Sequence, residues 1–230
     1  MIIVGNGMIS KAFKDSNYDF SGCIIFASGV SNSKCIDPLE FDREFNTLEK
    51  TLKYDKRIIY FSTSSIYDDS LIGSSYIKHK LNIESFITTK FKDYIIYRLP
   101  NVIGLTKNKN TLFNYFSDSI LNERSVSLYK KSTRYILDID DLVKYVFLTK
   151  NTSNSVINLN FNIPYKVTEI WQEVEKALNK KGISTLLNIG NDYKIDNSLF
   201  IKEIGENEIP ELNDRSYLQK TIQKYLINND

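Results

Sequence analysis

Several residue types are scarce in this chain of 230 residues, and their scarcity limits what the protein can be. The single histidine, His79, excludes a metal site that needs several imidazoles. The two cysteines, Cys23 and Cys35, form neither a metal-ligand spacing nor a redox pair, so we expect a reduced, cytoplasmic setting and no bound metal. No apolar run approaches a membrane span and no basic region precedes the first apolar segment, so we expect no membrane helix and no signal peptide.

An excess of charge of one sign is also lacking. Lys and Arg number 30 against 28 Asp and Glu, and a net charge of +2 gives no reason to expect a nucleic acid or a membrane surface as partner. The chain does have an apolar fraction of 42% and enough length to bury a core without disulfides. We therefore expect a soluble globular protein with one core domain and at most a small additional lobe.

Short apolar segments alternate with helical patterns through the first half of the chain. We expect strands over residues 2–4, 23–27, 57–62 and 94–99, and helices over residues 8–15, 41–54 and 76–90. Such alternation predicts an α/β fold, with a Rossmann-like parallel sheet and helices on both faces. Ligands bind sheets of this kind at the carboxyl ends of the strands.

The pattern is less regular beyond Gly104. We expect helices over residues 111–122, 140–149, 167–179 and 216–227. We expect extended segments over residues 125–129, 134–139, 156–160 and 188–195.

A glycine turn joins the first expected strand to the first expected helix. The turn is Gly5-Asn6-Gly7, and Ser10 is a further small residue on the helix that follows. Backbone N–H groups at a helix start attract anions, and glycines let a pyrophosphate approach the backbone closely, as in dinucleotide sites. A strand can also end in glycine merely to turn, so the pattern alone leaves both interpretations open.

The segment from Phe61 to Lys80 carries the strongest chemical signal. A strand there ends in hydroxyl residues, and Tyr76 and Lys80 follow one helical turn apart on the same face of a helix. A neighbouring ammonium favours the phenolate form of a tyrosine, which can exchange a proton with an alcohol oxygen while a hydride moves to or from a nicotinamide. Thr63 is the strand-end hydroxyl best placed to hydrogen-bond that oxygen. Because Tyr and Lys are abundant, the position of the pair after this strand, rather than its spacing, carries the interpretation.

These segments resemble the extended short-chain dehydrogenase/reductase superfamily, in particular its nucleotide-sugar epimerase/dehydratase branch. The matching segments run over most of the chain: Gly5–Ser10, Cys23–Ser28, Asn46, Phe61–Tyr67, Tyr76 with Lys80, Arg98–Gly104 and Arg134–Leu142. The resemblance implies that Thr63, Tyr76 and Lys80 are catalytic and that Asn46 is the family's structural asparagine. It implies contacts with NAD or NADP at Gly5, Asn6, Gly7, Met8, Ile9, Ala27, Ser28, Ser62, Lys80 and Pro100. It implies substrate contacts at Ser64, Asn101 and Arg134.

Two departures from the family pattern matter. Only residues 8–22 separate the glycine turn from Cys23, which leaves no room for the strands and helices that hold the adenosine half of the cofactor. We therefore expect the sheet to be shortened on the adenosine side. Ser64 and Ser65 stand where sugar 4,6-dehydratases carry an Asp-Glu pair, and serine is a poor general acid or base, so dehydration is disfavoured.

The expected division of the chain follows from the same resemblance. Residues 1–105 and 134–160 should form the cofactor-binding core, and residues 106–133 and 161–230 should form a small α+β lobe that covers the substrate. A homodimer through helices 41–54 and 76–90 would match the family's habit.

The expected function is NAD(P)-dependent epimerisation or keto reduction of a nucleotide-diphosphate sugar in surface polysaccharide assembly, such as O-antigen or capsule. The alternative is a non-catalytic binding or regulatory protein that kept the fold and lost full dinucleotide binding. Arg134 has a second interpretation, as a partner of one of the aspartates at positions 138, 140 and 141. His79 lies on another helix face from Tyr76 and Lys80, so we expect its side chain to be solvated.

Overall fold

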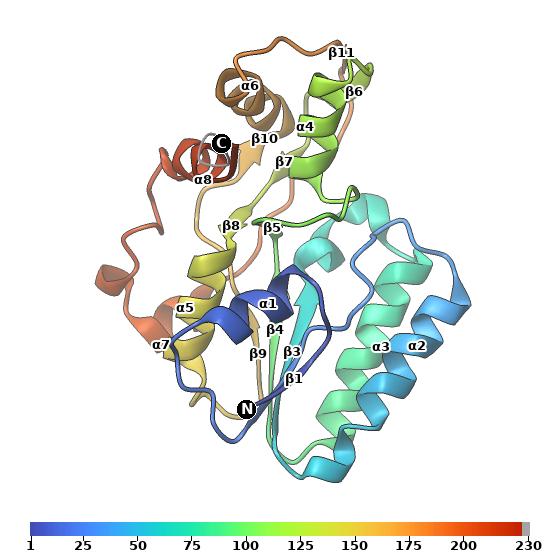
Figure 1. Ribbon diagram of the computed structural model, residues 1–230, viewed down its shortest axis with the longest axis vertical. Helices are drawn as coiled ribbons and strands as arrows, with labels where there is room; N and C mark the ends of the chain where they lie inside the picture. The colour runs from blue at the N-terminus through green and yellow to red at the C-terminus, as the bar shows by residue number, and fades with distance from the viewer. Residues whose placement is uncertain (227–230) are drawn as a thin grey trace.

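One parallel sheet stands between two layers of helices in the computed structural model, which describes residues 1–226 (Figure 1). The strand order is β1-β2-β3-β4-β9, and each neighbouring pair is parallel. These strands are β1 (Ile2–Val4), β2 (Cys23–Phe26), β3 (Arg57–Thr63), β4 (Tyr94–Leu99) and β9 (Ser155–Asn158). The predicted α/β fold with a Rossmann-like sheet is confirmed.

The strands are apolar on both sides because helices cover both faces. Ile25, Ile59 and Ile95 belong to the core beneath α1 (Met8–Asp15) and α5 (Ile139–Thr149). Their immediate neighbours along the strands, Ile24, Ile58 and Ile96, belong to the core beneath α2 (Pro38–Glu49) and α3 (Ser75–Lys90). Successive side chains of a strand point to opposite faces, so continuous apolar runs of this kind fit a sheet that is buried on both sides.

Strand β1 lies at an edge of the sheet and pairs directly with β2, through Ile2 with Ile24 and Val4 with Phe26. Within residues 1–226 no strand pairs with the other edge of β1. The shortening that the sequence predicts is therefore present, and it falls on the side where the adenosine half of a dinucleotide would lie.

The connections through α1 and α2 reveal a consequence of this shortening. Both connections step in the same direction across the sheet, from β1 to β2 and from β2 to β3, yet α1 and α2 lie on opposite faces. The two crossovers therefore have opposite hands, although right-handed crossovers strongly predominate in parallel sheets. A next strand on the outer side of β1 would give both crossovers the same hand, so the arrangement is the one expected of a Rossmann-like sheet without such strands.

The rest of the chain builds smaller sheets and further helices, most of them above this core, while α7 (Ser198–Ile204) lies beside α5 and β9 (Figure 1). Three strand pairs add to the structure: β5 (Asn101–Ile103) with β8 (Ile136–Asp138), β6 (Val126–Tyr129) with β11 (Ser184–Leu187), and β7 (Thr133–Arg134) with β10 (Tyr165–Lys166). The helices are α4 (Leu112–Leu121), α6 (Val167–Ala177), α7 (Ser198–Ile204) and α8 (Tyr217–Leu226). Single 3₁₀ turns are η1 (Leu52–Tyr54), η2 (Ser64–Tyr67), η3 (Asp69–Leu71) and η4 (Glu206–Glu208).

Several element boundaries differ from those expected. The helix expected over 41–54 begins at Pro38, because Asp37 caps it by accepting a hydrogen bond from the Leu39 N–H at 2.9 Å, and it ends at Glu49. The extended segment expected over 188–195 is wrong: the strand is β11, whose side chains are mostly exposed and so give no apolar alternation. Strands β5 and β10 and helix α7 were not expected, and residue 227 of the last expected helix lies outside the described residues.

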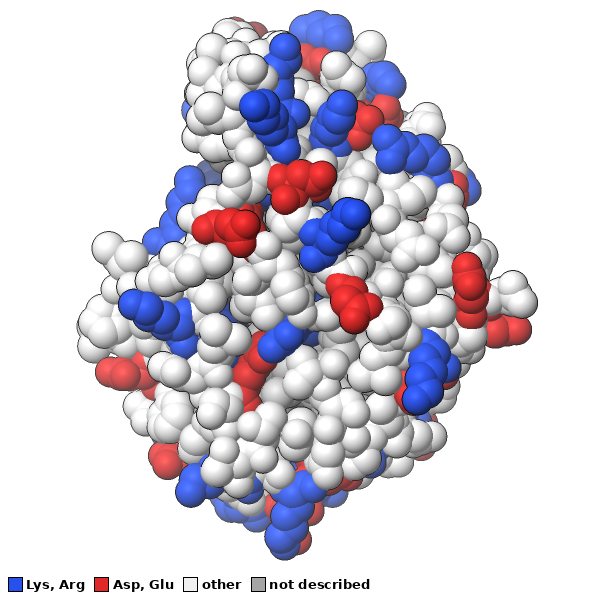
Figure 2. Space-filling view, turned by 180° about the vertical axis from the view of Figure 1, so that it is seen from behind, with Lys and Arg blue, Asp and Glu red and all other residues white. Residues whose placement is uncertain are grey.

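The surface carries both signs of charge. On the face seen in Figure 2, Lys and Arg side chains are interspersed with Asp and Glu side chains from one end of the molecule to the other. Among residues 1–226, no helix combines the length and the apolar character needed to cross a membrane.

A substitution at Phe13 tests how much the packing of α1 against the sheet contributes to stability. Its ring is completely buried and lies 5.0 Å from the Phe20 ring centroid and 5.4 Å from that of Phe61. We expect Phe13→Ala to lower the free energy of unfolding by about 3–5 kcal/mol in urea denaturation, because it leaves a cavity in the core. The control is the exposed neighbour Lys14, whose change to Ala should alter this free energy by less than about 0.5 kcal/mol. Equal losses in the two variants would contradict the packing described.

Candidate functional site

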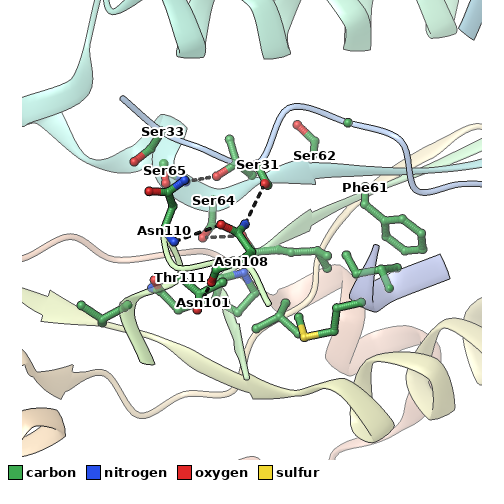
Figure 3. Close-up of a pocket in the computed structure, with 18 of the residues that line it drawn as sticks. Ser31, Ser33, Phe61, Ser62, Ser64, Ser65, Asn101, Asn108, Asn110 and Thr111 are labelled. Atoms are coloured by element: carbon green, nitrogen blue, oxygen red, sulfur yellow. Dashed lines mark hydrogen bonds between the residues drawn. The ribbon is translucent and has the colours of Figure 1, made fainter. Parts of the chain in front are cut away.

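A cavity of about 370 Å³ opens at the carboxyl ends of the central strands. Its walls come from the segments that follow β1, β2, β3 and β4, together with α3, α4 and the β7–β8 region. The close-up in Figure 3 shows hydroxyl and amide side chains gathered at one end and Phe61 at the other. The cavity thus offers a polar end and an apolar end within one space, at the edge where ligands of such sheets bind.

Most of the residues predicted for the site line this cavity. They are Gly7, Met8, Ile9, Ala27, Ser62, Thr63, Ser64, Tyr76, Lys80, Pro100, Asn101 and Arg134. Three predicted cofactor residues, Gly5, Asn6 and Ser28, are outside its lining. The Ser28 hydroxyl instead accepts a hydrogen bond at 3.1 Å from Arg43, on the outer side of α2.

The glycine turn provides the apolar end with exposed backbone N–H groups. Gly5 has φ +122°, and a Cβ there would lie 2.3 Å from the carbonyl oxygen of Ala27, so only glycine fits. Gly7 begins α1, and a Cβ on it would meet nothing within 4 Å in the described part of the chain. No side chain of residues 1–226 caps this helix start, so its first N–H groups are free to bind an anion. These residues fit the phosphates of a dinucleotide.

The three strand-end hydroxyls differ in how they are held. Thr63 is buried and its Oγ1 accepts the N–H of Ser65 at 3.1 Å. Ser62 donates to Glu84 at 2.5 Å, and Ser64 donates to the carbonyl of Leu99 at 3.1 Å. The Thr63 hydroxyl hydrogen is therefore not committed to the Ser65 contact, which leaves it able to donate to a ligand oxygen.

Tyr76 and Lys80 lie side by side at the wall of the cavity. Helix α3 begins beside them because Ser74 caps it, accepting the N–H of Ile77 at 3.3 Å. Tyr76 is 5% exposed and Lys80 only 2%, and the Lys80 Nζ lies 5.9 Å from the Tyr76 ring centroid. Tyr76 packs against Val30 and Ile77 while also facing the cavity. The pair that the sequence predicts is thus brought together in space.

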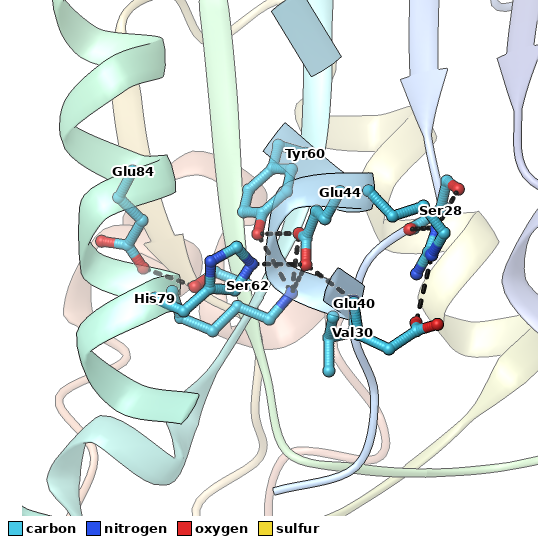
Figure 4. A network of polar contacts seen from close by, with 10 residues as sticks. Ser28, Val30, Glu40, Glu44, Tyr60, Ser62, His79 and Glu84 are labelled. Carbon is cyan, nitrogen blue, oxygen red and sulfur yellow. Dashed lines mark hydrogen bonds and ion pairs between the residues drawn. The ribbon is translucent and has the colours of Figure 1, made fainter. Parts of the chain in front are cut away.

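The buried carboxylate of Glu44, on α2, receives four donors (Figure 4). Its Oε1 accepts from the Tyr60 hydroxyl at 2.6 Å and from Lys80 Nζ at 3.0 Å. Its Oε2 accepts from the Val30 N–H at 2.7 Å, from His79 Nε2 at 2.9 Å and from Lys80 at 3.3 Å. Burial alone would raise the pKa of Glu44, but the charge of Lys80 and the hydrogen bonds outweigh it and lower the pKa to about 2.

This cluster corrects two expectations from the sequence. His79 is not solvated: it is 9% exposed, bonded to Glu44 and stacked on Phe41 at 4.5 Å. Asn46 is exposed, and Glu44 rather than Asn46 is the α2 residue that reaches Lys80. A signal was available, because Glu44 lies on the same helix stripe as the apolar residues Phe41 and Leu48.

Arg134 lies at the polar end, where a second buried carboxylate meets it. Its guanidinium lies 3.5 Å from the Asp68 carboxylate and 5.8 Å from the Tyr193 ring centroid. Asp68 is 3% exposed and also accepts hydrogen bonds from the Ser70 hydroxyl and N–H. The alternative partners of Arg134 at positions 138 and 140 bind Lys224 instead, and Asp141 accepts from a tyrosine on α8.

Amides and hydroxyls complete the polar end. Asn101 donates its backbone N–H to the carbonyl of Tyr135 at 3.1 Å. Asn108 bridges the cavity mouth by donating to Ser31 at 3.2 Å, which joins the loop after β2 to the loop after β5 (Figure 3). Asp68, Tyr193 and Asn108 were not foreseen, since nothing in the local sequence marks them.

Substitutions at Gly5 and Gly7 should affect different properties, the first the stability of the fold and the second the binding of a ligand. We expect Gly5→Ala to cost roughly 1–3 kcal/mol in urea denaturation because of backbone strain, beyond any effect of its clash with Ala27. Gly7→Ala should leave stability within about 1 kcal/mol of the wild type, yet weaken NADH or NADPH binding roughly tenfold or more in calorimetry, because the added methyl group stands before the helix start. If the folded Gly7→Ala variant binds NADH or NADPH as tightly as the wild type, the helix start at Gly7 does not bind the cofactor phosphates.

The ionisation of Glu44 makes the free energy of unfolding depend on pH in the acidic range. Because its pKa in the folded protein lies below the ordinary value of 4.5, ionised Glu44 stabilises the fold above pH 4.5, and this contribution disappears as the pH falls through about 2. We expect the wild type to lose about 3 kcal/mol of unfolding free energy relative to Glu44→Gln over this range. Urea denaturation at stepwise pH measures the difference, and parallel curves for the two proteins would show that Glu44 is not ionised in the fold.

No protein-family model and no curated protein matches this chain. Solved structures do match its fold. The chain is similar to a dTDP-glucose 4,6-dehydratase from Bacillus anthracis str. Ames in complex with NAD, with TM-score 0.69 and 18% identity over 90% of this chain and 73% of that chain. It is similar to a UDP-glucose 4-epimerase from Thermus thermophilus in complex with NAD, with TM-score 0.67 and 14% identity over 96% of this chain and 82% of that chain.

A third similar structure matches over nearly equal lengths. This is RMD from Pseudomonas aeruginosa complexed with NADPH, with TM-score 0.72 and 12% identity over 96% of both chains. Identities of 12% to 18% establish a shared fold. The chain therefore has the fold of the nucleotide-sugar epimerases and dehydratases that the sequence resembles, in a form whose sheet ends at β1.

Proposed function

We propose that the protein is an NAD(P)-dependent enzyme that epimerises or reduces a keto group of a nucleotide-diphosphate sugar, in the assembly of a surface polysaccharide such as O-antigen or capsule. One observation carries the proposal. Thr63, Tyr76 and Lys80 line the same cavity as the Gly7 turn, so a proton-transfer group and a phosphate-binding helix start face one ligand space. The similar proteins named above, two of them in complex with NAD and one with NADPH, support the cofactor class.

The residues present fit the phosphate and nicotinamide half of NAD(P) better than its adenosine half. Gly7, Met8 and Ile9 would hold the phosphates, and Ala27, Ser62, Lys80 and Pro100 would surround the remainder. Within residues 1–226 no strand lies beyond β1 to support the adenosine. When bound, the nicotinamide would supply the hydride chemistry that the protein side chains lack.

The positions of the protein side chains support the following proposed roles. Tyr76 would exchange a proton with the sugar oxygen, and Thr63 would orient that oxygen by a hydrogen bond. Ser64, Asn101 and Arg134 would contact the sugar and its diphosphate at the polar end. The lobe of residues 106–133 and 161–230 would cover the substrate. Ser65, like Ser64, offers no carboxylic acid to expel a hydroxyl, so dehydration remains disfavoured.

The alternative function is a non-catalytic binding or regulatory protein with the same fold. The edge position of β1 favours it, because a dinucleotide would leave its adenosine without a strand to pack on. The two functions differ in ligand binding. Calorimetry with NAD(H) and NADP(H) at millimolar concentration should show binding if the enzyme proposal is right, and no binding of either would favour the alternative.

The proposed homodimer would use α2 and α3. Exposed residues of these helices are mostly polar, with Leu39 and Leu81 as the apolar exceptions. Association through them would therefore rest on a small apolar contact, unlike the larger apolar faces of stable homodimers.

Tyr76→Phe tests the proposed chemistry. We expect it to lower turnover of a keto-sugar nucleotide by about 10²–10⁴-fold, because the ring remains and only the proton-transferring hydroxyl is lost. NADPH affinity should stay near that of the wild type. The control is Tyr115→Phe, which removes the hydroxyl of a side chain 45% exposed on α4 and should leave turnover unchanged. Equal turnover by wild type and Tyr76→Phe would rule out this mechanism.

A further inference from the structure

The carboxylate of Glu44 has no capacity left for a ligand. It is completely buried, and its two oxygens accept from Val30, Tyr60, His79 and Lys80 at 2.6–3.3 Å. A carboxylate offers about four acceptor positions, so these donors occupy them all. Glu44 therefore acts on the site through its neighbours, as a positioning residue.

Lys80 is equally committed to this cluster. Its ammonium donates to both Glu44 oxygens and to the Tyr60 hydroxyl at 3.1 Å, which accounts for its three N–H bonds. A Cβ on Gly29 would lie 2.8 Å from the Lys80 Nζ and 3.0 Å from Glu44 Oε1. The loop after β2 thus closes tightly over the ion pair, and Lys80 faces the cavity as half of a neutral pair rather than as a free cation.

We propose that Glu44 neutralises Lys80 and thereby fits this site for keto reduction rather than epimerisation. This inference rests on the proposed function and chooses between its two reactions. An ammonium stabilises a neighbouring phenolate through its net positive field, and an ionised carboxylate at 3.0 Å cancels most of that field at Tyr76. Tyr76 therefore faces a neutral ion pair, in which its hydroxyl is better placed to give a proton than to take one.

The two reactions need different forms of Tyr76. In keto reduction the carbonyl carbon gains a hydride from NADH or NADPH as reductant, and the carbonyl π electrons move onto oxygen. The Tyr76 O–H bond breaks as its proton passes to that oxygen, and water later reprotonates the phenolate. An epimerase must first oxidise the hydroxyl, with the phenolate taking its proton while hydride leaves the carbon. A neutralised Lys80 favours the first reaction.

The other charged groups near Tyr76 do not restore a positive field. Arg98 pairs with Glu84 at 2.6 Å, and the Arg134 guanidinium lies 3.5 Å from the Asp68 carboxylate. Tyr60 is uncharged, since burial and the nearby Glu44 carboxylate raise its pKa. His79 adds a charge only if it is protonated. Each of these lysine and arginine cations is thus matched by a buried carboxylate.

Glu44→Gln tests the inference because it removes the negative charge and keeps the size and part of the hydrogen bonding. The appearance of the Tyr76 phenolate is followed in the unliganded protein by ultraviolet absorbance during alkaline titration, as the difference between each protein and its Tyr76→Phe counterpart. We expect the phenolate in Glu44→Gln to appear about one pH unit lower, an effect of about tenfold, since Lys80 then carries an uncompensated charge. The double variant Glu44→Gln with Lys80→Met should return to the wild-type titration.

The control variant is Glu49→Gln, which removes an exposed carboxylate from the end of the same helix and should leave the titration unchanged. Thermal unfolding establishes that each variant is folded. An unchanged titration in folded Glu44→Gln would overturn the inference, and this readout holds whether or not any sugar nucleotide is turned over.

The wild type provides a second test that needs no variant. Supplied with a keto-sugar nucleotide and NADPH, it should consume NADPH in proportion to the alcohol formed, and it should not interconvert epimeric sugar nucleotides with NAD alone. Epimerisation with a retained cofactor would overturn the inference. If neither reaction occurs, the proposed function fails, and the alkaline titration still decides what Glu44 does to Tyr76.

Discussion

The buried ion pair between Glu44 and Lys80 is the contact on which the cavity wall at Tyr76 and Lys80 depends. It ties α2 to α3 directly, and the same carboxylate reaches β3 through Tyr60 and the loop after β2 through Val30. Removing one partner of such a pair leaves a charge without solvent or counter-ion, which is far more costly than the pair itself is stabilising. One carboxylate therefore fixes the relative positions of four segments: α2, α3, β3 and the loop after β2. These positions determine which charges lie near Tyr76.

The edge position of β1 is the second constraint on function. Among the described residues 1–226 no strand lies beyond β1, so the helix start at Gly7 can bind an anion but no neighbouring strand supports an adenosine. A ligand bound at this site would be held mainly by its phosphates and by the groups inside the cavity. A dinucleotide held in this way would exchange readily at each turnover, which agrees with the reductive chemistry inferred from Glu44 and Lys80.

Each of the two cations that line the cavity is paired with a carboxylate. Lys80 is paired with Glu44 and Arg134 with Asp68, and Lys80, Glu44 and Asp68 are buried. Burying such pairs keeps each cation in a fixed place at the expense of its long-range attraction for anions. The proposed recognition of a sugar by amide groups such as those of Asn101 and Asn108 would then rest on short-range hydrogen bonds.

Features that depend on neighbouring residues could be predicted without the structure: the bounds of α1 and β4, the glycine turn, and the placement of Tyr76 and Lys80 on one helix face, since residues four apart share a face. The sequence also predicted the shortened sheet, because the residues at positions 8–22 have room for one helix and no further strands. The partners of these side chains became known only from the folded arrangement of the helices and strands. Glu44 lies 36 positions from Lys80 and 35 from His79, which helical spacing alone had placed in solvent. The packing of α2 against α3 buries one particular carboxylate beside the Lys80 ammonium. A local sequence pattern cannot predict which one, because the contact joins segments far apart in the chain.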